Sequence, residues 1–102
     1  MDIQVLHIDD CPNWREAGTR LAAALKALGR YDVEVSYQLI EDTDTASRTG
    51  FAGSPTIVVN GADLFPSDGR TSDLACRVYV TPQGLAGLPT QAQVLDSLVA
   101  AL

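Results

Sequence analysis

One cysteine occupies a position suited to chemistry. Cys11 follows an apolar segment over residues 3–8 and precedes a stretch with helical periodicity, so we expect it directly before a helix. There, the unpaired N–H groups of the first turn and the positive end of the helix dipole favour the thiolate. The thiolate is the form of cysteine that attacks disulfides and peroxides and binds soft metals. Cys11 is therefore the candidate catalytic nucleophile.

Four neighbours are expected to tune the ionisation of this thiol. Pro12 suits the first position of a helix, where its missing N–H is no loss, and Arg15 adds positive charge one turn in. Asp9 and Asp10 oppose them, because nearby negative charge disfavours a thiolate. The sequence does not decide whether the pKa of Cys11 is raised or lowered overall. We expect it to be lowered modestly, which favours the thiolate. Asp9 and Asp10 could also handle protons, but a helix-capping role is the commoner one and suits Asp10 best.

The second cysteine, Cys76, is a less favourable partner for Cys11. It begins an apolar segment over residues 76–80, after a strand that we expect to lead away from Cys11. Five extended residues span about 16 Å, whereas a disulfide tolerates a Cα separation of about 7 Å. We therefore expect Cys76 near the opposite end of the sheet, buried as a small hydrophobe, unless the loop over residues 62–75 folds back. It remains the one candidate for a second thiol.

No cofactor or ordinary metal site is predicted. Structural zinc needs four Cys or His ligands, and the chain has only three such residues, His7, Cys11 and Cys76. We expect His7 to be a sheet histidine rather than a base, because it lies within a strand. A soft two-coordinate metal needs fewer ligands, so that alternative stays open. The sequence contains no phosphate loop and no dinucleotide-binding fingerprint.

The elements that must position Cys11 follow from the periodicity of the apolar residues. Gly29 marks the end of the first helix, and Thr90 with Gln93 forms a capping box before the last one. In order, we expect a strand (3–8), a helix (12–28), a strand (33–39), a short helix (within 43–49), a strand (56–59), a loop (62–75), a strand (76–80) and a helix from 91. The first two strands should pair in parallel and the last two as a hairpin. The predicted class is α/β, with one four-stranded mixed sheet and helices packed on it.

Length and charge restrict the remaining possibilities. The chain of 102 residues makes a single domain, 1–102, and 46% hydrophobic residues supply its core. The formal charge of −6 with scattered basic residues argues against nucleic acid and anionic membranes as partners. No apolar run approaches the roughly 20 residues of a membrane span, and no signal-peptide pattern opens the chain, so a cytoplasmic protein is expected.

Two short motifs resemble the thioredoxin family. The turn Asp9-Asp10-Cys11-Pro12-Asn13-Trp14 is similar to the family's active-site turn, and residues 50–56 resemble the segment that carries its cis-proline. The nearest resemblance is to small bacterial thioredoxin-like proteins with a Cys-Pro-Asn-Trp turn, some of them labelled alkylmercury-lyase-like. This resemblance implies that Pro55 is cis and that the Ser54 backbone lies beside Cys11 to bind an extended substrate. Trp14 is then either a substrate-stacking surface or a packing residue.

The chain departs from the family where Trp14 replaces the second cysteine of the Cys-x-x-Cys pair. The leading hypothesis is accordingly a monothiol thiol–disulfide oxidoreductase, with Cys11 as nucleophile, a thiol or protein disulfide as substrate, and glutathione, another protein or Cys76 as resolving partner. One alternative is a binding module for a soft metal or an organomercurial. Another is a non-catalytic interaction domain that keeps the fold without the chemistry.

Overall fold

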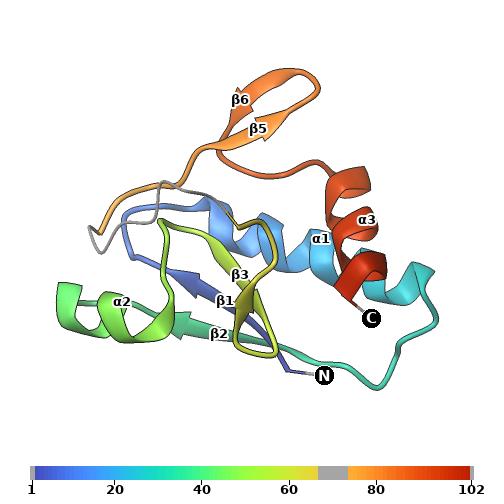
Figure 1. Cartoon of the computed structure of the whole chain (residues 1–102), viewed down its shortest axis with the longest axis horizontal. Coiled ribbons are helices and arrows are strands. Elements are labelled where there is room, and N and C mark those ends of the chain that lie inside the picture. The colour runs from blue at the N-terminus through green and yellow to red at the C-terminus, as the bar shows by residue number, and fades with distance from the viewer. Residues whose placement is uncertain (1, 67–73, 102) are drawn as a thin grey trace.

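The computed structural model describes residues 2–66 and 74–101 and shows a mixed α/β architecture (Figure 1). Three helices are present where three were predicted, the second of them short. The elements in chain order are β1 (Ile3–His7), α1 (Asn13–Ala27), β2 (Val35–Leu39), α2 (Thr43–Thr49), β3 (Thr56–Val59), β4 (Ala62–Asp63), β5 (Tyr79–Thr81), β6 (Gly84–Ala86) and α3 (Gln91–Ala101).

The main sheet has four strands in the order β2-β1-β3-β4. β1 pairs in parallel with β2, in the register Ile3 opposite Val35, and antiparallel with β3, in the register Ile3 opposite Val59. The parallel pair is joined by α1, as the crossover argument predicts. The expectation of a four-stranded mixed sheet is therefore confirmed, and β1 at its centre leads directly into the turn that carries Cys11.

The two faces of the sheet bury different sets of side chains, because successive residues of a strand point to opposite sides. One face packs on α1 and α3, with a core formed by Ile3, Val5, Ala17, Leu21, Ala24, Leu25, Ile57, Val59, Val94 and Leu98. The other face packs on α2, with a core formed by Leu6, Ile8, Cys11, Ile40, Ala46, Phe51 and Val58. Cys11 thus belongs to the α2 side, although it directly precedes the helix that covers the other side.

The helix ends follow the sequence signals with two exceptions. Gly29 adopts a positive φ of 71° just after α1, and the Thr90 and Gln93 side chains each accept the other's backbone N–H at the start of α3. However, Pro12 is the N-cap of α1 rather than its first helical residue, and no side chain caps this end. The expectation that Asp10 caps α1 is therefore wrong. Leu102, predicted to extend the apolar face of the last helix, lies outside the described residues.

The fourth strand of the sheet is not the predicted one. Asn60 and Gly61, both at positive φ, form a tight turn that returns the chain at once, so β4 takes the position beside β3. The predicted strand over 76–80 therefore cannot pair there. Its second half becomes β5, which pairs only with β6 in a hairpin that stands apart from the main sheet in Figure 1. Of the predicted 62–75 loop, residues 67–73 lie outside the described residues.

Candidate functional site

Cys11 is fully buried at the point where the end of β1 meets the segment before β3. Its thiol donates to the Ser54 carbonyl oxygen at 3.5 Å. The Ser54 hydroxyl in turn accepts the Ile8 backbone N–H at 3.1 Å, which ties the two segments together. The peptide bond between Ser54 and Pro55 is cis. The structure therefore brings Cys11, Ser54 and Pro55 into one site, as the resemblance implies.

Cys76 lies in the same site, contrary to the expectation that it lies at the far end of the sheet. Ser54 forms an isolated parallel bridge with Cys76: its N–H donates to Ala75 O and its carbonyl oxygen accepts from Arg77 N, both at 2.8 Å. Cys76 is exposed rather than buried. The prediction failed because it treated residues 76–80 as a strand continuing the sheet, whereas residues 75–77 pair with Ser54 in the segment before β3.

Cys11 affects the ionisation of the Cys76 thiol. A hydrogen bond with Cys11 is the main cause that raises the pKa of Cys76, followed by burial and by the negative charges of Cys11 and Asp10. Both cysteines are free in this structure. The fully buried Cys11 and the exposed Cys76 both lie beside Ser54, and the carboxylate of Asp10 is close enough to affect the exposed thiol.

A buried ion pair anchors the segment that carries Cys76. The Arg77 guanidinium donates to Asp63 Oδ2 at 2.9 Å and also to Phe65 O, and the two charged side chains are only 6% and 14% exposed. The guanidinium also lies over the Tyr79 ring, 4.5 Å from its centroid. Because a buried charge is stable only when it is paired and hydrogen-bonded, Arg77 holds residues 75–77 in one place.

Gly53 and Tyr79 complete this anchor. Gly53 has a φ of 105°, and a Cβ built on it would lie 2.8 Å from the Arg77 Cβ, so only glycine lets the Arg77 backbone approach this closely. The Tyr79 hydroxyl donates to the Pro55 carbonyl oxygen, and burial raises the pKa of Tyr79, so this hydroxyl stays protonated. Residues 53–55 and 75–79 are thus locked together.

This arrangement changes the role expected of Ser54 and Pro55. The resemblance implied that the Ser54 backbone binds an extended substrate, but both its N–H and its carbonyl oxygen are already paired with the chain's own residues 75–77. Pro55 is fully buried, and its carbonyl oxygen accepts from Tyr79. The segment that carries Cys76 therefore occupies the Ser54 backbone groups that the resemblance assigned to an extended substrate.

Trp14 and Arg15 lie on the other side of the turn. The Trp14 ring stacks on His7, with centroids 4.3 Å apart, and meets the edge of Tyr37. The Arg15 guanidinium lies over the Trp14 ring, 5.0 Å from its centroid. Trp14 also packs against the core on the α1 face, whereas Cys11 belongs to the core on the α2 face. The structure therefore supports packing roles for Trp14 and the buried His7.

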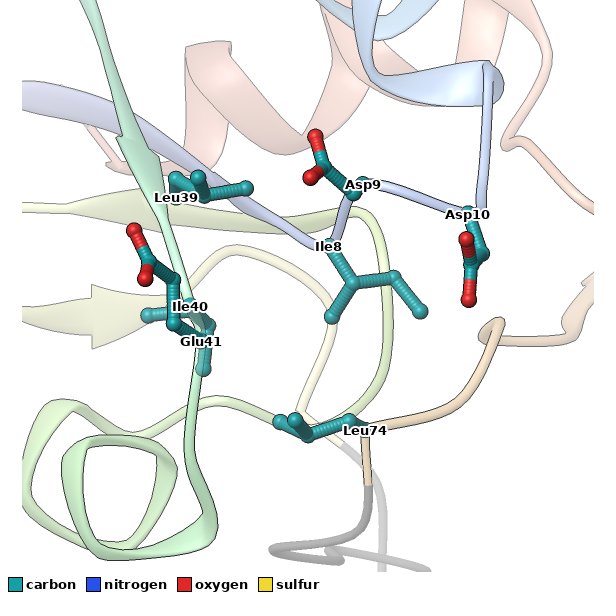
Figure 2. A pocket seen from close by; sticks show the side chains of 7 residues that line it. All are labelled: Ile8, Asp9, Asp10, Leu39, Ile40, Glu41 and Leu74. Carbon is teal, nitrogen blue, oxygen red and sulfur yellow. The ribbon is translucent and has the colours of Figure 1, made fainter.

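A pocket of about 360 Å³ is lined in part by residues that precede the two cysteines in the chain, although neither cysteine lines it. Figure 2 shows its lining: residues before Cys11, the end of β2, and one residue from the segment before Cys76. Four lining side chains are apolar and three are carboxylates; together they are Ile8, Asp9, Asp10, Leu39, Ile40, Glu41 and Leu74. Asp9 and Asp10, predicted as tuning residues, therefore also line a cavity.

The site does not resemble an ordinary metal centre. Within residues 2–66 and 74–101, no three His, Cys, Asp or Glu side chains are grouped so that they could hold a metal ion.

None of the helices that the structure describes is long and apolar enough to cross a membrane.

Several residues of the site carry no signal in the sequence. Arg77 and Asp63 are ordinary charged residues 14 positions apart, and their spacing does not indicate that they form a buried ion pair. Glu41 and Leu74 reach the pocket from segments that are separate in sequence from the Cys11 turn. The two cysteines themselves were identifiable, but their contact depends on the path of residues 75–77.

Comparison with models of known protein families, with curated proteins and with solved structures finds no match to this chain.

Proposed function

We propose that this protein carries out thiol–disulfide exchange through Cys11 and Cys76. The observation that supports it is the pairing of Ser54 with residues 75–77, which holds an exposed thiol against a buried one. When two thiols are adjacent, the second can resolve the mixed disulfide formed by the first, so no external resolving thiol is needed. Of the resolving partners that the sequence left open, glutathione, another protein or Cys76, the proposal takes the pairing of Cys11 with Cys76, and it assigns the first attack to Cys76 where the sequence analysis expected Cys11.

Exposure suggests the order of the two steps. The Cys76 thiolate attacks a substrate disulfide, forms a mixed disulfide and releases one substrate thiolate. Cys11, after losing its proton to solvent, then attacks the Cys76 sulfur, forms the Cys11–Cys76 disulfide and releases the second thiolate. Two electrons pass from the thiol pair to the substrate. An external thiol such as glutathione restores the dithiol by the reverse exchange.

The experiment is an equilibrium titration of the purified protein in glutathione redox buffers. We expect a reversible intramolecular disulfide, detected as the loss of two hydrogen atoms in the mass and of two alkylatable thiols. The Cys11→Ser variant should instead accumulate a mixed disulfide with glutathione at Cys76. The proposal is overturned if both thiols of the folded protein stay free in oxidising buffer, or if Cys11→Ser yields no mixed disulfide.

The fold proposed for this function is thioredoxin-like. Three features support it: β1 and β2 are parallel and joined by a helix, β3 is antiparallel to β1, and the cis Ser54–Pro55 bond lies beside a cysteine that precedes α1. The difference is the second thiol. Trp14 fills the position of the family's second cysteine, and Cys76 reaches the site from a remote segment instead.

The same pair of thiols favours a second candidate, the binding of a soft two-coordinate cation. Thiolates select Hg²⁺ and Cu⁺, and two sulfur ligands are enough for either. Equilibrium binding of Cu⁺ under reducing conditions tests this candidate. Loss of binding in both Cys11→Ser and Cys76→Ser would support it, and unchanged affinity in either variant would exclude it. If neither exchange nor binding is found, a non-catalytic interaction domain becomes the better description.

A further inference from the structure

The pocket described above includes residues that precede each of the two cysteines in the chain. Ile8, Asp9 and Asp10 come directly before Cys11, and Leu74 lies two residues before Cys76. Neither cysteine is among the lining residues, so a disulfide held in this pocket would have to extend beyond the lining to reach the exposed Cys76 sulfur. The pocket volume of about 360 Å³ is at the small end of the range for small-molecule sites.

The pocket combines an apolar lining with negative charge. Figure 2 shows Ile8 in the middle of the lining, between Asp10 on one side and residues 39–41 on the other, with Leu74 from the remote segment closing it. Asp9, Asp10 and Glu41 are all exposed. No ion pair with any of these three carboxylates is present among residues 2–66 and 74–101, whereas Asp32, Asp44 and Asp63 each have an arginine partner there.

From this combination we infer that the pocket selects small disulfides that carry a positively charged amine on a short apolar chain. The inference rests on the proposed exchange function and names its substrate class. The apolar side chains accept the methylene groups, the carboxylates attract the ammonium group, and the rest of the disulfide extends out of the pocket toward Cys76. A disulfide with carboxylate groups would be repelled by the same three residues.

Asp10 links the pocket to the thiols electrostatically. Its negative charge is one of the causes that raise the pKa of Cys76, so its field reaches the reacting sulfur. A cationic group bound beside Asp10 offsets that field and favours the Cys76 thiolate. Binding of a cationic disulfide should therefore also assist ionisation of the attacking thiol, which an anionic disulfide cannot do.

The test compares three disulfides of similar size that differ in charge: cystamine, hydroxyethyl disulfide and dithiodiglycolate. Each exchange rate with the reduced protein is divided by its rate with 2-mercaptoethanol, which removes intrinsic differences in reactivity. We expect the normalised rate to be about tenfold higher for cystamine than for dithiodiglycolate at low salt, with the neutral compound between them. The preference should decrease as the ionic strength rises.

Glu41→Gln is the most informative variant, because Glu41 lies outside the turn that carries Cys11. It should reduce the cationic preference about threefold. Glu34→Gln is the matched control: it removes the same charge from an exposed position at the opposite end of β2, and should leave the preference unchanged. Asp10→Asn should also reduce the preference, and because it alters the Cys76 thiol for all three compounds, only the ratio of rates is compared.

The outcomes separate this inference from the proposed function. Equal normalised rates for the three compounds, or an equal effect of Glu41→Gln and Glu34→Gln, would overturn the substrate class while leaving thiol exchange intact. If no exchange occurs with any of the three compounds, in oxidising and in reducing glutathione buffers alike, the proposed function is overturned, and this inference with it.

Discussion

The two sides of the turn between β1 and α1 differ in the roles of their side chains, and the sequence does not indicate this difference. On one side, His7, Trp14 and Arg15 have side chains that often carry chemistry, yet they stack on one another, and Trp14 packs against the core. On the other side, Cys11 is buried beside an ordinary Ser54, and its partner Cys76 arrives from a distant segment. The comparison teaches that the proposed site is formed by the pairing of two distant segments, rather than by the local motif.

If this pairing forms the site, removing its anchor should have the largest effect. Arg77→Met leaves Asp63 buried without its partner, which we expect to lower the free energy of unfolding by about 3–5 kcal/mol. The exchange activity should fall as well, because residues 75–77 are no longer held over Ser54. Urea denaturation and the glutathione titration measure the two effects.

The double variant Asp63→Asn with Arg77→Met provides the control. It removes the uncompensated charge and should recover part of the stability but not the thiol pairing. If thiol pairing were retained in Arg77→Met with its stability lowered, the ion pair would stabilise the fold without positioning Cys76.

A narrower test removes the close approach of the two segments. Gly53→Ala places a Cβ 2.8 Å from the Arg77 Cβ and should lower the free energy of unfolding by about 1–3 kcal/mol. It should also make the Cys11–Cys76 disulfide easier to reduce. Gly84→Ala is the matched control, because Gly84 has nearly the same φ, 108°, with open space around its missing Cβ. Equal effects on the disulfide would mean that backbone strain, not the approach of Arg77, matters at residue 53.

The other side of the turn should respond in stability only. Trp14→Leu removes the stacking on His7 and should cost about 1 kcal/mol of unfolding free energy. The redox equilibrium of Cys11 and Cys76 should stay the same, because Trp14 packs on the opposite face of the sheet. A changed equilibrium in this variant would show that the two sides are coupled, and would return Trp14 to the candidate site.

The smallest expected effect concerns the pH dependence of Cys76. Because its pKa is raised, a smaller fraction is thiolate at a given pH, so alkylation should have its midpoint above the ordinary value of about 8.5. Cys11→Ala removes the main cause and should lower the midpoint, which speeds alkylation at pH 8. Asp10→Asn should lower it less. An unchanged midpoint in Cys11→Ala would mean that the two thiols do not interact.

Local signals predicted much of the fold. The apolar periodicity of α1, the glycine after it, and the capping box of α3 act within a few residues, so they can be recognised in the sequence. The parallel pairing of β1 and β2 follows from the helix between them. The errors arose where two local signals competed: the Asn60-Gly61 turn made β4 the edge strand, and residues 76–80 lost that position.

The sequence by itself determined that one cysteine precedes a helix and that no second cysteine follows it in the turn. The resemblance to the thioredoxin family added the expectation that Ser54 and Pro55 lie beside that cysteine. Only the tertiary structure decided that Cys76 completes the site and that Asp9, Asp10 and Glu41 line one pocket. The physical reason is the range of the interactions. Helix caps and turns are satisfied between near neighbours, whereas the path of residues 75–77 depends on a buried ion pair, a glycine contact and backbone hydrogen bonds between distant segments.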